Sequence, residues 1–235
     1  MLNRILNLFR APNRAAAPEN RFTFHEIGFH GDAYLLSLVD HLVKARGIEC
    51  FIETGTNVGC SLAYFARNYP AVPAFSCEPD KEAYRLARRN VGAARQVTIL
   101  NATSRDLFLR LKRRDADLFK RKTLFWLDAH GYGFEWPLRD EVRFISENFA
   151  RAYILIDDFK VPGMDCFGYD EYDGRVCSYG YVKDSFSRKD YQLFYPIYTD
   201  RTSSYHPLRG WGLFALGEEF PIPAQLQDKM ARAQT

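Results

Sequence analysis

The feature that most constrains the fold is an alternation of short apolar runs and amphipathic stretches that begins near residue 48. Five runs are typical of buried strands: CFIET (50–54), PAFSCEP (73–79), QVTILNA (96–102), TLFWLDA (123–129) and AYILIDDF (152–159). Helical periodicity follows each of the first four, over 59–69, 80–91, 104–114 and 137–149. Strands that alternate with helices form βαβ units, so we expect a mostly parallel sheet covered on both faces.

Two more strand-like runs, 191–199 and 210–217, follow without a helix between them, which predicts an antiparallel hairpin at one edge of the sheet. The helix starts agree with this pattern, because Asp80 stands at an N-cap position and Pro137 stands near the start of the fourth helix. The predicted fold is α/β: a Rossmann-like, doubly wound sheet of seven strands, mostly parallel with one antiparallel edge hairpin.

The length of 235 residues suits one domain. We expect an N-terminal helical extension and linker over 1–45, the α/β domain over 46–220, and a C-terminal tail over 221–235. Within the domain, residues 160–190 are rich in Gly, Asp and Tyr, and a long irregular segment after a strand is typical of a lid or substrate loop.

Apolar residues within 2–10 recur at helical spacing among arginines, and two interpretations fit this segment. It is either a short amphipathic helix on a membrane surface, or a helix that packs on the domain or on a partner subunit of a homo-oligomer. The second interpretation is favoured because the apolar stripe is short. The segment lacks the pattern of a signal peptide.

Composition excludes several classes of function. A net charge of +3 gives no footprint for binding nucleic acid. The five cysteines are an odd number without C-x-x-C spacing, which argues against a disulfide framework or a zinc site and favours reduced thiols in a cytoplasmic protein. No apolar run approaches the length of a membrane span.

The turn after the first expected strand, ETGTNVGCS (53–61), stands where a ligand-binding turn is expected. Gly55 and Gly59 let the backbone approach a ligand at a helix N-terminus, and Glu78 ends the next strand, where a ribose-binding acid is expected. NAD and S-adenosylmethionine both fit this outline. Glu53 favours S-adenosylmethionine, because a carboxylate beside the glycines repels a pyrophosphate but attracts an ammonium and a sulfonium.

The glycine spacing, G-x-x-x-G, also departs from the G-x-G-x-x-G of dinucleotide sites. Ser104 follows the third strand and has two interpretations: it bonds the adenine ring or it caps its own helix. The predicted cofactor-binding residues are Glu53, Gly55, Thr56, Asn57, Gly59, Ser61, Glu78 and Ser104.

Acidic residues follow the fourth and fifth expected strands. Asp128 and His130 are two positions apart, and Asp157 and Asp158 are adjacent. Because ligands bind outside the carboxyl ends of strands in an open α/β sheet, these side chains are expected to meet at one rim. Hard oxygen ligands suit Mg²⁺, Mn²⁺ or Ca²⁺, so a divalent metal site is predicted, with Mg²⁺ as the favoured ion.

Other roles for the aspartate pair remain open. Adjacent residues of a regular strand point to opposite faces, so both carboxylates reach one ion only if the backbone leaves strand geometry. One of them could instead pair with Arg139, Arg143 or Lys160, or face solvent. His130 is either a general base or a buried histidine bonded to the backbone.

The segments FIETGTNVGCS, FSCEPD, FWLDAHG and ILIDDF resemble those of the metal-dependent O-methyltransferases related to macrocin O-methyltransferase, over roughly residues 48–217. That resemblance implies the class I methyltransferase fold and the methylation of a sugar hydroxyl. It assigns Asp128, Asp157 and Asp158 to a divalent cation. Some members use an acid two positions after the strand-four ligand as the base; here that position is His130, which departs from the pattern.

The expected function is therefore a divalent-metal-assisted, S-adenosylmethionine-dependent O-methyltransferase, with Asp128 and His130 in catalysis. The expected acceptor is a hydroxyl of a sugar or another small polar molecule. The alternatives are an NAD-dependent oxidoreductase or epimerase, and a non-catalytic binding protein on a methyltransferase scaffold.

Several residues of the C-terminal half have two interpretations. His206 and Arg209 either contact substrate or brace the hairpin. The tyrosines of the 160–190 loop either stack on substrate or pack on a partner subunit. Trp126 and Trp136 are expected in the core.

Overall fold

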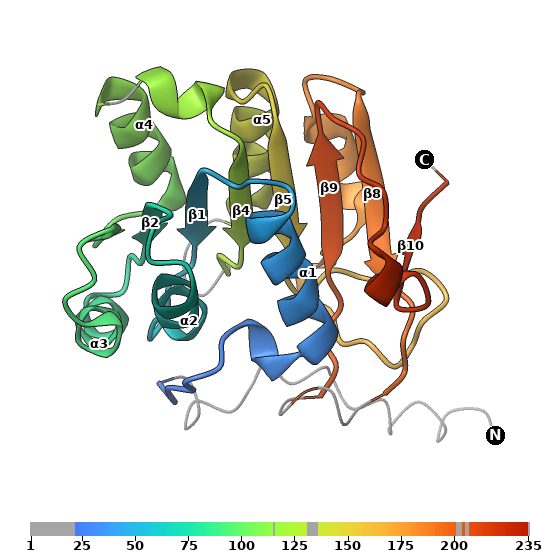
Figure 1. Ribbon diagram of the computed structural model, residues 1–235, viewed down its shortest axis with the longest axis horizontal. Helices are drawn as coiled ribbons and strands as arrows, with labels where there is room; N and C mark the ends of the chain where they lie inside the picture. Colours follow the sequence, from blue (N-terminus) through green and yellow to red (C-terminus); the bar gives the residue numbers. More distant parts are fainter. Residues whose placement is uncertain (1–21, 115, 131–135, 201–203, 205–206, 235) are drawn as a thin grey trace, which may run out of the picture.

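The computed structural model describes residues 22–234 apart from 115, 131–135, 201–203 and 205–206. A large sheet runs through the molecule, and helices lie on both sides of it (Figure 1). The strand order is β3-β2-β1-β4-β5-β9-β8-β10. The doubly wound α/β architecture expected from the sequence is therefore confirmed.

The large sheet is parallel except near one edge. Its strands are β1 (Cys50–Thr54), β2 (Ala74–Cys77), β3 (Val97–Leu100), β4 (Thr123–Leu127), β5 (Ala152–Ile156), β8 (Tyr191–Pro196), β9 (Gly212–Leu216) and β10 (Met230–Arg232). β1 to β5 pair in parallel, whereas β9 runs antiparallel to both of its neighbours, β5 and β8. The predicted antiparallel pair is thus confirmed.

The number of strands differs from the prediction. Seven strands were expected, and within the described residues the large sheet has an eighth, β10, which pairs antiparallel with β8 through partners such as Ala231 and Tyr195. This strand comes from the segment 221–235 that was expected to be a tail. With three residues, Met230–Arg232, it is too short to give a periodic signal in the sequence.

The helices form two layers. They are α1 (Ala33–Lys44), α2 (Cys60–Asn68), α3 (Lys81–Val91), α4 (Ser104–Arg114), α5 (Leu138–Asn148) and α6 (Tyr179–Val182), with single 3₁₀ turns η2 (Phe29–Gly31), η3 (Ala116–Lys120), η4 (Lys183–Ser185) and η6 (Ala224–Leu226). In Figure 1, α1 lies in front of the sheet and α5 behind it. α2 contacts α3, and α5 contacts both α4 and α6.

The caps explain where the helices begin. The carboxylate of Asp80 accepts hydrogen bonds from the backbone N–H groups of Glu82 and Ala83, at 2.9 and 3.0 Å, and so starts α3. Pro137 stands at the N-cap position of α5. Both starts were predicted.

The core lies on both faces of the central strands. Every residue of β1, β4 and β5 is buried, as a strand between two helical layers requires. Trp126 and Trp136 are 1% and 7% exposed, so their expected place in the core is confirmed.

The helix α1 contributes to the same core. Its buried residues are Leu35, Leu38, Val39, Leu42 and Val43, which follow the 3–4 spacing of one helix face. Asp32 caps this helix by accepting from the N–H groups of residues 34 and 35. The helix predicted over 2–10 lies outside the described residues.

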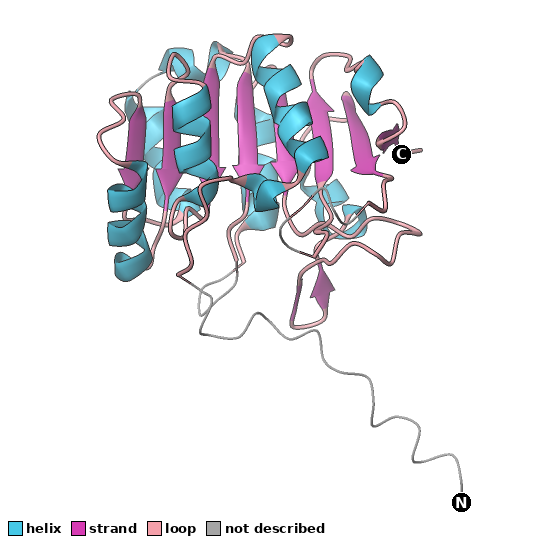
Figure 2. Cartoon of the chain, turned by 60° about the horizontal axis from the view of Figure 1, so that its bottom comes forward, coloured by secondary structure: helices cyan, strands magenta, loops and turns pink. Residues whose placement is uncertain are grey.

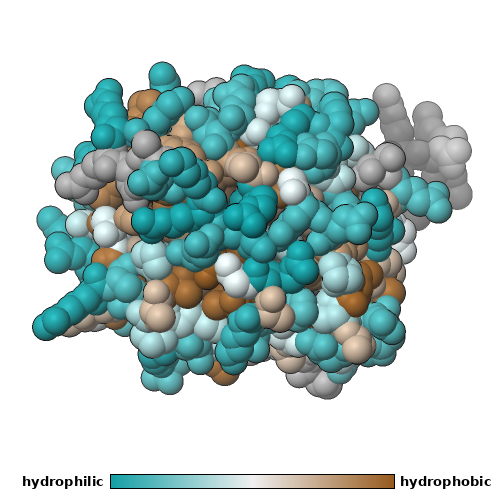
Figure 3. Space-filling view, turned by 45° about the horizontal axis from the view of Figure 1, so that its top comes forward, coloured by the Kyte–Doolittle hydropathy of each residue, from teal (hydrophilic) through white to brown (hydrophobic). Residues whose placement is uncertain are grey.

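The segment after β5 contains a small hairpin, β6 (Glu171–Tyr172) and β7 (Arg175–Val176). In Figure 2 this two-stranded sheet stands apart from the large one, beyond the ends at which the parallel strands finish. Hydrophilic residues predominate on the face of the molecule in Figure 3, and hydrophobic residues form small separate groups there. None of the described helices is both long and apolar enough to cross a membrane.

Candidate active site

A cavity of about 660 Å³ opens at the carboxyl ends of the parallel strands. Ligands of open α/β sheets bind at this edge, and the volume lies within the range of small-molecule sites. Six of the predicted site residues line it: Gly55, Asn57, Glu78, Ser104, Asp128 and His130. Glu53, Thr56, Gly59 and Ser61 are not among its walls.

Gly55 forms the turn between β1 and the cavity. Its φ is +82°, and a Cβ there would lie 2.3 Å from the carbonyl oxygen of Asp128. Only glycine fits both the left-handed backbone and this close approach between the ends of β1 and β4. Gly59, with φ +86°, begins α2 in the same way. The two glycines of the predicted turn therefore shape the backbone beside the cavity.

Glu78 is fixed at the end of β2. One carboxylate oxygen accepts from the N–H of Asn57 at 2.8 Å, and the other accepts from the N–H of Asp80 at 2.9 Å. Two backbone donors thus hold the carboxylate at the cavity wall, in the position expected for an acid that binds ribose hydroxyls.

Glu53 lies behind the glycine turn and not in the cavity wall. It is 2% exposed, and its Oε2 accepts from the Ser76 hydroxyl at 2.6 Å. The Ser76 hydroxyl also lies 2.5 Å from that of Thr56. Burial, opposed by the Ser76 hydrogen bond, raises the pKa of Glu53 to about 8. Glu53 and Thr56 therefore belong to a buried polar network under the turn.

Two predicted serines have different surroundings. The Ser61 hydroxyl accepts from the backbone N–H of Phe29 at 3.1 Å, so in this structure it anchors the segment before α1. Ser104 begins α4 and lines the cavity, but the side chain that caps the helix is Thr103, whose hydroxyl accepts from the N–H of Asp106 at 3.3 Å. Of the two interpretations of Ser104, capping is not the one seen here.

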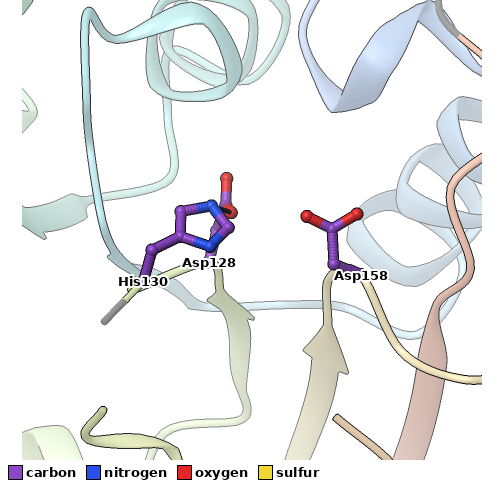
Figure 4. A group of neighbouring side chains, drawn as sticks. All are labelled: Asp128, His130 and Asp158. Atoms are coloured by element: carbon purple, nitrogen blue, oxygen red, sulfur yellow. Dashed lines mark ion pairs between the residues drawn. The ribbon is translucent and has the colours of Figure 1, made fainter. Parts of the chain in front are cut away.

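Asp128, His130 and Asp158 form a group that could hold a metal ion. One ligand atom from each lies within 4.8 Å of the other two. Figure 4 shows Asp128 and His130 side by side at the end of one strand, with the carboxylate of Asp158 facing them from the end of the next. We call this group, with the adjacent Asp157, the acidic rim.

Asp157 has a different partner from the one predicted. β5 ends at Ile156, and Asp158 has φ +48°, so the backbone leaves strand geometry where the prediction required it to. The Oδ2 atom of Asp157 nevertheless lies 2.7 Å from Nε2 of His30, and Asp157 is outside the group that could hold a metal. His30 comes from η2, far away in the sequence.

Arg209 is the arginine that pairs with the rim. Its Nη1 lies 3.1 Å from Oδ1 of Asp158 and 4.0 Å from Oδ1 of Asp170. Arg139 instead donates to the Ser185 hydroxyl at 3.2 Å. The open question about Arg209 thus has a partial answer, since it contacts the rim, whereas His206 lies outside the described residues.

His130 is held between two carboxylates. Its Nε2 lies 3.0 Å from Oδ1 of Asp128, and its Nδ1 lies 2.7 Å from both Oδ2 of Asp170 and the Tyr172 hydroxyl. Burial lowers the pKa of His130, but the hydrogen bonds to the two carboxylates outweigh it and raise that pKa well above its usual value.

Burial and mutual repulsion also shift the acids of the rim. Burial, reinforced by the charge of Asp157, raises the pKa of Asp158 to about 8 and that of Asp128 to about 6. His30 is half-buried, which lowers its pKa, but the charge of Asp157 outweighs this and raises it to about 9. Burial and repulsion therefore favour the protonated forms of Asp128 and Asp158, whereas the charge of His30 outweighs burial at Asp157 and holds its pKa below the usual value.

Three residues of the site were absent from the sequence-based prediction. His30 and Asp170 contact the rim, and Glu141, which is 2% exposed, lies in the cavity wall near the Ser104 hydroxyl. Nothing in the sequence linked His30 to a strand end. The Asp-Gly dipeptide at 173–174 did indicate a tight hairpin next to Asp170.

Among the comparisons with known proteins, only the comparison of structures found similar proteins. No protein family model matches the sequence, and no curated protein matches it. An O-methyltransferase from Bacillus cereus, solved with S-adenosylhomocysteine, superposes with a TM-score of 0.55 at 14% identity, over 87% of this chain and 84% of that one. The chain has the class I methyltransferase fold.

Two further structures share this methyltransferase fold. TomG from Streptomyces achromogenes, an O-methyltransferase of tomaymycin synthesis solved with S-adenosylmethionine, gives a TM-score of 0.54 at 17% identity, over 79% of each chain. Cofactor-bound Rv0187 from MTB gives 0.54 at 15% identity, over 89% of this chain and 85% of that one. The resemblance to the macrocin-related subtype stays a prediction.

Proposed function

We propose that the protein is an S-adenosylmethionine-dependent O-methyltransferase, assisted by a divalent cation, that acts on a hydroxyl of a sugar or another small polar molecule. The observation that carries this proposal is that Asp128 and His130 belong to two parts of the site at once. Both residues line the large cavity, and both belong to the group that could hold a metal. A methyl donor in the cavity and a hydroxyl at the acidic rim would therefore share one boundary.

The residues of the cavity fit S-adenosylmethionine, which supplies a methyl group on a positively charged sulfur. Glu78 offers an oriented carboxylate for the ribose hydroxyls, and Gly55 brings backbone to the cavity wall without a side chain. Negative charge on Asp128 favours a guest that carries an ammonium and a sulfonium, and such a guest would also favour ionisation of the buried Glu53, whose pKa burial raises to about 8 in the empty protein.

The rim fits a divalent cation by its donor set, which has two carboxylates and one imidazole in Asp128, Asp158 and His130. Among the described residues, Oδ1 of Asp157 is buried without a hydrogen bond, and Oδ1 of Asp158 lies 3.1 Å from Nη1 of Arg209. A bound cation would lower the pKa of an acceptor hydroxyl.

The chain's own residues supply the remaining chemistry. His130 is the residue proposed to accept the proton of the acceptor hydroxyl; because its bonds to Asp128 and Asp170 raise its pKa in the empty site, this role requires a bound cation to replace the contact between Nε2 and Asp128. The rings of Trp136 and Tyr181 stack with their centroids 4.6 Å apart, and the Trp136 ring packs at an angle against that of Tyr172, the partner of His130. Positioning and the exclusion of water are the contributions expected from such a site.

The test is calorimetry of S-adenosylhomocysteine binding, with and without Mg²⁺, in the wild type, Glu78→Gln and Asp158→Asn. We expect micromolar or tighter binding by the wild type, a loss of about tenfold or more in Glu78→Gln, and loss of the Mg²⁺ effect alone in Asp158→Asn. The control is Asp117→Asn, at an exposed position far from the site. A wild type that does not bind S-adenosylhomocysteine contradicts the proposal.

A second candidate, a non-catalytic binding protein, is favoured by one observation: Asp157 and Asp158 already have cationic partners in His30 and Arg209. This alternative predicts that the cofactor binds with the same affinity with and without Mg²⁺, and that no methyl group is transferred. The NAD-dependent alternative has less support. A Tyr-x-x-x-Lys pair, Tyr179 and Lys183, is present, but neither residue lines the cavity, and the Tyr179 hydroxyl lies 3.2 Å from that of Tyr191.

A further inference from the structure

The hairpin β6–β7 brings two polar side chains to His130. Asp170 immediately precedes β6, and Tyr172 ends it. Both lie 2.7 Å from Nδ1 of the imidazole, the nitrogen on the side away from Asp128. A loop inserted after β5 thus completes the surroundings of a residue that follows β4.

The hydrogen atoms of this cluster determine the state of Nδ1. The Tyr172 hydroxyl donates its single hydrogen to Oδ2 of Asp170 at 2.6 Å, so its oxygen can only accept from the imidazole. Oδ2 of Asp170 accepts that hydrogen and lies 2.7 Å from Nδ1 of His130, and a carboxylate oxygen has no hydrogen to donate to the ring. Nδ1 must therefore carry a hydrogen, which it shares between the two oxygens.

Asp170 itself is fixed by the backbone. Its N–H donates to the carbonyl oxygen of Asp158 at 2.9 Å, and its carbonyl oxygen accepts from the N–H of Cys177 at 2.8 Å. The hairpin turn, Asp173–Gly174, has positive φ at both positions, as a type I′ turn requires. Tyr172 is held by the edge of the Trp136 ring, 5.2 Å between centroids.

We propose that Asp170 and Tyr172 are positioning residues that lock His130 with Nδ1 protonated and Nε2 presented to the rim. The orientation of the ring does not depend on the proposed function. Only the role assigned to Nε2 rests on it. Either use, accepting a proton or binding a cation, requires the ring to be held in this orientation. A carboxylate on the remote nitrogen is the usual way to fix a tautomer in both kinds of site.

The first test is the NMR signal of the ring N–H groups in ¹⁵N-histidine-labelled full-length protein, with His130→Gln for assignment. We expect a slowly exchanging, downfield Nδ1 proton on His130 in the wild type. Asp170→Asn should lose or strongly shift it, and Tyr172→Phe, which keeps the ring packing, should shift it less. Asp173→Asn, on the exposed tip of the same hairpin, is the matched control and should leave it unchanged.

The second test is titration with Mn²⁺ followed by electron paramagnetic resonance. Removing a residue that orients a metal ligand typically weakens metal binding by about 10- to 100-fold, and we expect that loss in Asp170→Asn. Binding of S-adenosylhomocysteine should stay within about twofold of the wild type. If the wild type shows the Nδ1 signal but does not bind Mn²⁺, the proposed metal site is contradicted, whereas the positioning of His130 by Asp170 and Tyr172 stands. An unchanged Nδ1 signal in both Asp170→Asn and Tyr172→Phe overturns the inference.

Discussion

Single ionisable residues of this site are buried where water cannot stabilise their charged form. Glu53 is the clearest case, because its carboxylate is buried with one hydroxyl donor and no cationic partner is found for it among the described residues. When it ionises, such a group destabilises the empty protein. The same group favours a positively charged guest, so stability and binding oppose each other at this position.

This opposition predicts a pH-dependent gain in stability for Glu53→Gln. The pKa of Glu53 is about 8 in the folded protein against 4.5 as its ordinary value, so ionisation costs stability as pH rises from 4.5 to 8. Glutamine removes that cost. In thermal unfolding without cofactor, we expect the variant to gain on the order of 1 to 4 kcal/mol over the wild type at pH 8, and little near pH 4.5.

The control for this prediction is Glu147→Gln, at an exposed position of α5. It should give no pH-dependent difference. The prediction also requires Glu53→Gln to bind S-adenosylhomocysteine more weakly than the wild type. A variant that gains nothing at pH 8 shows that Glu53 is not destabilising.

At the scale of elements, the strands and helices of the parallel half follow from the sequence. Cys50–Thr54 was predicted to the residue, because buried parallel strands read as continuous apolar runs. β10 and η2 were not predictable in this way. The first has three residues, and the second has positive φ at Phe29 and His30, a conformation that residues other than glycine rarely adopt.

The site was predictable to the extent that it lies at strand ends. Asp128, Asp158 and Glu78 are placed by β4, β5 and β2, so the alternation alone brought them to one edge. Contacts supplied by irregular segments were not predictable. Neither the pairing of His30 with Asp157 nor the access of Asp170 to His130 leaves a periodic trace in the sequence.

The hairpin β6–β7 gives a prediction at this scale. Replacing Asp173–Gly174 by Ala-Ala puts side chains that disfavour φ above zero into a turn that needs it twice. We expect faster amide hydrogen exchange over about residues 168–178 and unchanged exchange in β1 and β4. Gly163→Ala is the control, because Gly163 also has φ +71° and open space around it, but lies outside the hairpin. Unchanged exchange in the hairpin contradicts the role of the turn.

At the scale of the whole molecule, the acidic rim and the side chains that contact it come from the full length of the described chain. His30 precedes α1, Asp158 follows β5, and Arg209 precedes β9. Four carboxylates, Asp128, Asp157, Asp158 and Asp170, are in direct contact with three basic side chains, His30, His130 and Arg209. The balance of charge at the rim therefore depends on the complete fold, and one added cation changes it.

This balance predicts how Mg²⁺ and His30 affect thermal unfolding. His30→Gln leaves the buried Asp157 without its charged partner, and breaking a buried pair typically costs about 3 to 5 kcal/mol, so Tm should fall by many degrees.

A cation that binds only the folded rim raises Tm by mass action, and it should do so more in His30→Gln, whose rim is more negative, than in the wild type. Asp158→Asn should lose the Mg²⁺ effect, and NaCl at equal ionic strength should not reproduce it, since screening acts weakly on buried charges. His41→Gln, at a half-buried histidine on α1, is the matched control and should respond to Mg²⁺ as the wild type does. If Mg²⁺ shifts Tm equally in all four proteins, the cation acts elsewhere, and the charges of the rim are balanced by His30, His130 and Arg209 alone.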